Sequence, residues 1–334
     1  KVDTWDGFIF YTMSDEAPDL MDYLDPIPEI YKNHNFKDQI RAQWVRVELD
    51  VNWKFFCDNF NESYHTRFVH PQVPSVIDQD HFTSRYEMFP KGHARIIQMG
   101  RPSLRDRVKE DEDHPFKMIL ESWGVDVSQY PDYETLSEQG WTDLKKAKRK
   151  LYKEKGYHHY KNLSDEELTE SPFQFIFPNI AMGIQADGCI LLNWFPHPTD
   201  PEKCFFDLWD MGYPIGGSAK GIGKTGREND QAFTSTSAGI GKKDEANDQE
   251  FLSRTKANPV KLQEVELDFR DYDGGKGVED LWDHVVYQDW QLTDGLRRGV
   301  RSKGYQEPYL AAQETRVRYF HETLHDYLNG KEPK

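Results

Sequence analysis

The chain has 334 residues, of which 30% are charged, with a formal net charge of −16 at pH 7 and a mean hydropathy of −0.84. No run approaches the roughly 20 apolar residues that a membrane span needs, and a strongly negative chain disfavours binding to nucleic acid. We therefore expect a soluble, cytoplasmic protein that binds neither membranes nor nucleic acids, built as one large domain or two small ones.

The first predicted element is a strand over residues 5–13, rich in aromatic and β-branched side chains. The chain begins at Lys1, almost inside this element, so we expect that an upstream part has been removed. A second strand is predicted where Val45, Val47, Leu49 and Val51 alternate with polar residues.

Residues 51–64 are expected to turn helical. Because Pro71 disfavours helical geometry at the residue before it, we place His65 near a helix end and His70 just beyond it.

The later elements follow from the same signals. Residues 81–100 predict a hairpin, and 104–170 are charged and helical in character, with a capping box at Ser164 opening a helix. Strands are expected at 173–184, 189–195 and 205–209. Residues 215–258, rich in Gly, Lys, Asp and Ser, predict a long mobile insertion, and 278–328 predict amphipathic helix.

Two features exclude other classes. The three cysteines, Cys57, Cys189 and Cys204, lack CxxC spacing, so we expect free thiols in a reducing compartment. Residues 218–225 imitate a phosphate-binding loop, but Ser218 replaces its first glycine and no buried strand precedes it, so we reject nucleotide binding.

The most informative stretch holds His65 and His70, five residues apart, with Glu62 just upstream. Two imidazoles at this spacing predict a metal site whose third ligand lies elsewhere. If that ligand is a carboxylate, the set suits non-haem Fe(II) and leaves coordination positions open for oxygen chemistry. The same set also suits zinc.

This stretch resembles the iron-binding segment of the large (alpha) subunit of Rieske non-haem iron ring-hydroxylating oxygenases. The residues that carry the resemblance are Asn52, Trp53, Lys54, Asn59, Glu62, Tyr64, His65 and His70. Segments resembling the family in the same order include 5–10, 177–179, 196–201, 286–296 and 314–321.

The resemblance implies roles for individual residues. His65 and His70 would bind iron, with Asp289 as the third ligand and Asp280, Asp283 and Asp294 as nearby alternatives. Glu62, where most of the family has Asp, would carry electrons toward the iron from the cluster of a neighbouring subunit, and Asn59 would be a further catalytic residue. The expected substrate-binding residues are Phe56, Phe60, Phe177, Asn179, Met182 and Trp194.

The resemblance also implies an α+β, helix-grip (Bet v 1/START-like) antiparallel sheet with flanking helices and a mononuclear iron between them. Residues 1–15 would continue from a Rieske domain, and 16–334 would form the catalytic domain. The chain contains neither the C-x-H nor the C-x-x-H pair of a Rieske [2Fe–2S] cluster. It would therefore depend on a cluster outside it, on a ferredoxin or reductase as electron donor, and on assembly as a homotrimer with or without beta subunits.

The expected reaction is hydroxylation of an aromatic or similarly apolar substrate with O2, as in aromatic hydrocarbon catabolism. Two other classes are open. A zinc hydrolase could use the same residues, although His65 and His70 are five positions apart rather than at the i, i+4 spacing of the His-Glu-x-x-His motif of zincins. A helix-grip module could also hold an apolar ligand without catalysis.

Overall fold

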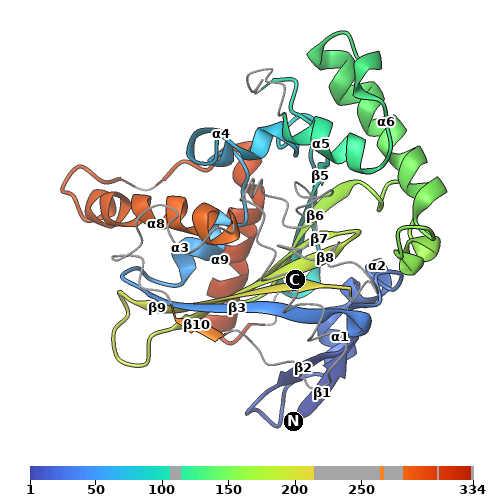
Figure 1. Ribbon diagram of the computed structural model, residues 1–334. Coiled ribbons are helices and arrows are strands. Elements are labelled where there is room, and N and C mark those ends of the chain that lie inside the picture. The colour runs from blue at the N-terminus through green and yellow to red at the C-terminus, as the bar shows by residue number, and fades with distance from the viewer. Residues whose placement is uncertain (106–113, 214–263, 267–280, 307, 332–334) are drawn as a thin grey trace.

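A computed structural model describes residues 1–105, 114–213, 264–266, 281–306 and 308–331 (Figure 1). Its centre is an eight-stranded sheet in which every neighbouring pair is antiparallel except β10 and β3. In spatial order the strands are β10 (Glu264–Glu266), β3 (Ile40–Leu49), β9 (Cys204–Gly212), β8 (Gly188–Pro196), β7 (Ile180–Gln185), β6 (Glu170–Ile176), β5 (Ala94–Met99) and β4 (Arg85–Met88).

Helices α3 (Lys54–Asn59), α8 (Leu281–Val300) and α9 (Thr315–Leu328) lie on one side of this sheet (Figure 1). Their apolar residues join the inward side chains of the strands in one core, which includes Phe56, Val285 and Phe320. The short helix α4 (Thr66–Val69) lies beside α8 and carries the predicted ligands at its two ends. The predicted α+β class, an antiparallel sheet with flanking helices, is confirmed.

The opposite side of the sheet is covered by the start of the chain. Strands β1 (Val2–Trp5) and β2 (Phe8–Tyr11) form a hairpin, followed by α1 (Leu20–Leu24) and α2 (Ile27–Ile30). The single strand predicted for residues 5–13 is wrong, because Asp6 and Gly7, at φ 43° and 95°, make a tight turn that reverses the chain. Trp5 and Phe8 then pack in a core with Met182 and Leu191 of the sheet.

A third core lies under α5 (Pro115–Ser122) and α6 (Tyr133–Leu151), within the region predicted to be helical. The capping box at Ser164 is present, since Ser164 N donates to Glu167 Oε2 at 2.6 Å and Glu167 N donates to Ser164 Oγ at 3.2 Å. It closes a turn rather than a helix, because β6 begins six residues later, at Glu170.

The hairpin predicted at 81–100 is confirmed as β4 and β5, and the strands at 189–195 and 205–209 as parts of β8 and β9. The single strand at 173–184 is wrong, because a turn at residues 177–179 divides it into β6 and β7. The insertion predicted at 215–258 lies outside the described residues.

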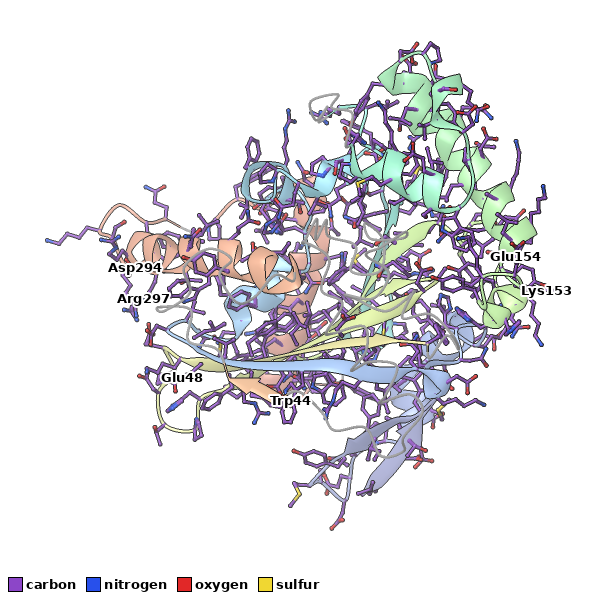
Figure 2. The ribbon with its side chains drawn as sticks, viewed as in Figure 1. Trp44, Glu48, Lys153, Glu154, Asp294 and Arg297 are labelled. Atoms are coloured by element: carbon purple, nitrogen blue, oxygen red, sulfur yellow. The ribbon has the colours of Figure 1, made fainter. Side chains whose placement is uncertain are left out.

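Several charged side chains lie at the periphery, such as Lys153 and Glu154 past the end of α6, and the ion pair of Asp294 and Arg297 on α8 at 3.2 Å (Figure 2). Among the described helices, none combines the length and the apolar character that would be needed to cross a membrane.

Candidate metal centre

The loop between α3 and α4 determines where His65 and His70 lie, because α4 follows it directly. Helix α3 ends at Asn59, where Asn61 Nδ2 donates to the carbonyl of Cys57 at 2.8 Å. The chain then turns, and Glu62 Oε2 accepts from His65 N at 3.2 Å, at the start of α4. We expected one helix running to His65. The structure has two short helices instead, because these side chains satisfy backbone groups at the break.

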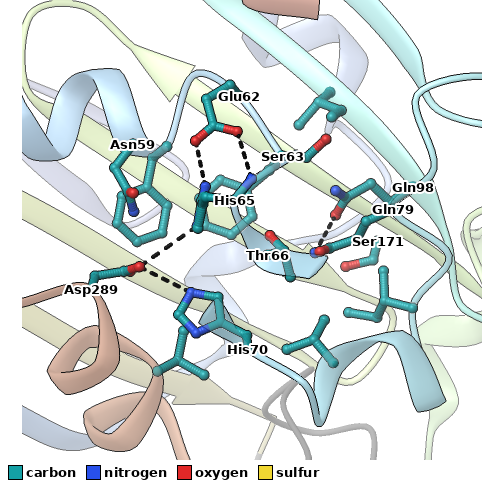
Figure 3. Close-up of a pocket in the computed structure, with 16 residues that line it drawn as sticks. Asn59, Glu62, Ser63, His65, Thr66, His70, Gln79, Gln98, Ser171 and Asp289 are labelled. Carbon is teal, nitrogen blue, oxygen red and sulfur yellow. Dashed lines mark hydrogen bonds and ion pairs between the residues drawn. The ribbon is translucent and has the colours of Figure 1, made fainter. Parts of the chain in front are cut away.

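Asp289 reaches the two histidines from α8, far along the chain. Its Oδ1 lies 3.0 Å from His70 Nε2 and 3.7 Å from His65 Nε2. One nitrogen from each histidine and one carboxylate oxygen all lie within 4.8 Å of one another. His70 and Asp289 are buried, at 2% and 1% exposed. Figure 3 shows the three side chains converging on one point.

Each histidine makes a hydrogen bond through Nδ1, the ring nitrogen that faces away from Asp289. His65 Nδ1 donates to Glu62 Oε1 at 2.5 Å, and His70 Nδ1 donates to Gln288 Oε1 at 2.8 Å. Gln288 Oε1 also accepts from Gln72 Nε2 at 2.9 Å. Because Nδ1 carries the hydrogen in both rings, each Nε2 lone pair faces Asp289, which is the tautomer that a metal ligand needs.

The electrostatics of His65 follow from these neighbours. Burial acts to lower the pKa of His65, but the carboxylates of Glu62 and Asp289 outweigh it and raise that pKa above its ordinary value. The two carboxylates therefore favour a positive charge at this position, whether a proton on His65 or a metal cation.

The residues fit a divalent metal ion. His70 Nε2 and both carboxylate oxygens of Asp289 are buried without a hydrogen-bond partner among the described residues. Such atoms are costly to bury unless something binds them. Two imidazole nitrogens and one carboxylate form the facial set that leaves further positions open on Fe(II). Of the alternative third ligands, Asp294 is exposed and paired with Arg297, while Asp280 and the side chain of Asp283 are not described.

A pocket of about 560 Å³, including its mouth to solvent, opens beside these ligands (Figure 3). Apolar side chains and uncharged polar side chains both line it. The lining residues are Asn59, Phe60, Glu62, Ser63, His65, Thr66, His70, Val73, Ile77, Gln79, Ile96, Gln98, Ser171, Phe173, Val285 and Asp289.

Of the six expected substrate-binding residues, the structure places only Phe60 on this pocket. Phe56 and Trp194 stack at 6.2 Å inside the main core, and Phe177 packs on Phe320 and Tyr327. These side chains hold the helices against the sheet, so we correct their assignment to the pocket wall.

Two further corrections concern the strands. Asn179 Nδ2 donates to the carbonyl of Trp194 at 2.6 Å, so Asn179 closes the turn between β6 and β7. Met182 points to the opposite face of β7, into the core with Trp5 and Phe8. Side chains alternate along a strand, and without the pairing register the sequence could not tell which set faced the metal.

The sequence interpretation missed Gln288 and most of the residues that line the pocket. Gln288 orients His70, and Gln98 and Ser171 line the pocket. Gln288 could have been found, because it directly precedes Asp289 in a segment already singled out. Gln98 and Ser171 carry no local signal, since polar residues on strands are ordinarily expected to face solvent.

The fold and the convergence of two histidines and one carboxylate are typical of the catalytic domain of a mononuclear non-haem metal enzyme. Residues 36–214 and 265–330, well over half of the chain, match the family described as the ring-hydroxylating alpha subunit (catalytic domain). The chain belongs to this family of Rieske-type non-haem iron oxygenases, as the resemblance had implied.

Similar proteins agree with this membership. The carnitine monooxygenase oxygenase subunit of Acinetobacter pittii (strain PHEA-2) is 30% identical over 124 residues, which are 35% of this chain and 32% of that one. A solved quaternary ammonium Rieske monooxygenase, studied for carnitine oxidation by gut microbiota, matches with a TM-score of 0.52 at 14% identity. A quaternary ammonium Rieske monooxygenase with an inhibitor bound gives a TM-score of 0.50 at 16% identity.

Both solved structures align with 98% of this chain, and they share the fold of its described residues. The chain in turn spans 61% of the length of each. Enzymes of this family generally use a mononuclear iron and a Rieske cluster, and work with electron donors and a neighbouring subunit.

Proposed function

We propose that this domain binds one Fe(II) ion through His65, His70 and Asp289 and uses it to activate O2 for the hydroxylation of a small organic substrate. The observation that carries the proposal is the convergence of donor atoms from His65, His70 and Asp289. His70 Nε2 and the Asp289 oxygens are buried and have no hydrogen-bond partner among the described residues. When bound, iron supplies the redox chemistry and the coordination positions at which O2 and the electrons meet.

The chain's own residues would prepare that site. Glu62 and Gln288 fix the rings of His65 and His70, so that both Nε2 lone pairs stay directed at the ion. Phe60 and Phe173 stack at 5.3 Å in the pocket wall and would exclude water from the face on which the substrate lies.

Electrons would come from a Rieske [2Fe–2S] cluster outside this chain, through Glu62. This residue supports the proposal because it touches His65 and its side chain is 8% exposed, in the short loop before α4. A single carboxylate could therefore connect an approaching donor to an iron ligand.

The surface near Glu62 supports docking of a neighbouring subunit. A groove lined by Ser63, Tyr64, Phe68 and Phe82 opens there, and Phe68 and Phe82 are 78% and 82% exposed. Large apolar side chains gathered on a surface mark interaction sites. We propose a homotrimer, with or without beta subunits, in which this groove receives the cluster-bearing part of the neighbour.

The pocket also bears on the chemical class of the substrate. The sequence favoured an aromatic or apolar compound, whereas the similar proteins are a carnitine monooxygenase subunit and a quaternary ammonium monooxygenase. Phe60, Ile96 and Phe173 in the pocket support an apolar body for the substrate in either case.

The reaction is tested with ¹⁸O2. The iron-loaded domain is combined with a reduced Rieske donor and a panel of small apolar compounds, and products are analysed by mass spectrometry. We expect a hydroxylated product that carries ¹⁸O from O2, with one donor-derived electron pair consumed per turnover. Label arriving from water, or product formed without O2, would refute the oxygenase and favour a hydrolase.

A further inference from the structure

Uncharged polar side chains gather on the side of the pocket away from Asp289 (Figure 3). Gln98 on β5 and Ser171 on β6 are paired directly in the sheet register, and Gln79 precedes β4. We call Gln79, Gln98 and Ser171 the distal polar group. Gln98 and Ser171 are 4% and 2% exposed, so both polar side chains occupy buried positions of the strands.

The hydrogen bonds within this group leave capacity unused. Gln79 Nε2 donates to Gln98 Oε1 at 3.4 Å, a long contact, and Gln79 Oε1 is buried without a partner among the described residues. Gln185 Nε2 donates to Ser171 Oγ at 3.1 Å, which uses one of the two lone pairs of this hydroxyl and leaves its hydrogen free to donate. Polar atoms in this state are costly to bury unless a ligand or water completes them.

The charges of the pocket lie at its other end. Among the described residues that line it, the ionisable ones are Glu62, His65, His70 and Asp289, all at the metal centre, and none is Lys or Arg. A carboxylate at the distal end would therefore lose its hydration without gaining a cation. Phe60, Ile96 and Phe173 add apolar side chains to the wall of the same pocket.

We propose that the distal polar group binds an uncharged hydrogen-bonding group of the substrate, a hydroxyl, carbonyl or amide, while the substrate's apolar body lies along Phe60 and Phe173 toward the metal. A side-chain amide offers both a donor and an acceptor, so it can serve any of these three groups. The inference deepens the proposed oxygenase function and rests on it for which end of the substrate reacts, but not for binding itself.

The test compares binding of four probes to the full chain by calorimetry under anoxic conditions, with Fe(II) and after removal of the metal. The probes are toluene, benzyl alcohol, benzamide and L-carnitine. We expect benzyl alcohol and benzamide to bind at least about tenfold more tightly than toluene, which corresponds to one good hydrogen bond, and L-carnitine to bind more weakly than either.

Two substitutions locate the preference. Gln98→Met keeps length and volume, and Ser171→Ala removes a single oxygen. Each should reduce the preference for benzyl alcohol over toluene to about threefold or less, while toluene affinity and metal content stay unchanged. Gln129→Leu, at an exposed position, is the matched control and should keep the preference. If Gln98→Met loses its cooperative thermal transition, Ser171→Ala carries the test alone.

Equal affinity for toluene and benzyl alcohol, tightest binding of L-carnitine, or an unchanged preference in both variants would each overturn the inference. Because the distal polar group does not include the metal ligands, we expect the preference to persist in the metal-free chain. If the wild-type chain does not bind iron, the oxygenase is refuted. If that chain still prefers benzyl alcohol over toluene, this inference stands, so the two failures are distinguishable.

Discussion

His70 and Gln288 are 218 positions apart in the chain, and the Nδ1 of the histidine donates to the Oε1 of the glutamine at 2.8 Å. Gln288 stands beside Asp289 on α8, so one helix supplies both a candidate ligand and the residue that orients another. This contact ties the segment that carries His65 and His70 to the C-terminal helices.

Loss of this contact should weaken metal binding without removing a ligand. We expect Gln288→Leu to lower the affinity for Fe(II) by roughly 10- to 100-fold, because the ring of His70 is then free to rotate away from the ion. Competition with a fluorescent chelator measures the change. Gln291→Leu, exposed on the same helix, is the control. Equal affinities in the two variants would contradict the role given to Gln288.

Glu62 should matter for electron delivery more than for metal retention. Glu62 is not among the three converging ligands, so we expect Glu62→Ala to bind iron, with an affinity lowered about as much as in Gln288→Leu. When it is loaded with saturating Fe(II), we expect it to oxidise an added Rieske donor at least about 100-fold more slowly than the wild type. Stopped-flow absorbance of the cluster follows this step. Glu322→Ala, at an exposed ion pair on α9, should behave as wild type. A wild-type rate in Glu62→Ala would remove Glu62 from the electron route.

Acid should destabilise the fold through buried neutral histidines. His93 is 0% exposed, donates from Nε2 to the carbonyl of Tyr23 at 2.7 Å and accepts at Nδ1 from Phe177 N at 3.1 Å. Burial lowers the pKa of His93 to about 4, below its usual 6.5. Between these values the unfolded chain binds a proton that the folded chain does not, so the free energy of unfolding falls as the pH drops from about 6.5 to 4.

Urea denaturation at pH 7, 6 and 5 measures this slope. We expect His93→Gln to be less stable at pH 7 but to have a slope shallower by up to one proton, whereas His325→Gln, exposed on α9, keeps the wild-type slope. A variant whose stability falls with acid as steeply as that of the wild type would show that His93 is not neutral in the fold.

A buried ion pair should stabilise the lobe of α5 and α6. Lys148 Nζ lies 3.4 Å from Asp187 Oδ1, with the two side chains 0% and 2% exposed. We expect Lys148→Met to cost about 3–5 kcal/mol of unfolding free energy, because it leaves a carboxylate buried without its cation. Adding Asp187→Asn should recover part of this loss, and Lys150→Met, at an exposed position, should cost little. Chemical denaturation of the four proteins checks the pattern.

Local patterns were sufficient for several elements and failed in identifiable places. The alternation at Val47 and Leu49 predicted β3, and the turn signals at Pro90 and Gly92 predicted the hairpin of β4 and β5. Lys148 lies in the stretch predicted to be charged and helical, and its buried charge is paired with Asp187, which is 39 positions away. A local pattern carries no information about such a partner.

The site shows the same division. The spacing of His65 and His70 predicted a metal site, and family resemblance singled out Asp289, which the fold brings beside them. The pocket wall depended on which face of β7 was turned to the metal. In β7, Met182 alternates with Ala181 and Gly183. The sequence alone does not say which of the two sets faces the metal until the pairing of β7 with β6 and β8 is known.

The central claim is that His65, His70 and Asp289 hold one iron ion, and metal analysis of protein purified without oxygen tests it most directly. We expect about one iron per chain in the wild type, almost none in His65→Ala, His70→Ala and Asp289→Ala, and a wild-type content in Asp294→Ala, whose carboxylate is exposed and paired with Arg297. Tightly held zinc, no metal at all, or iron retained by Asp289→Ala would contradict the account.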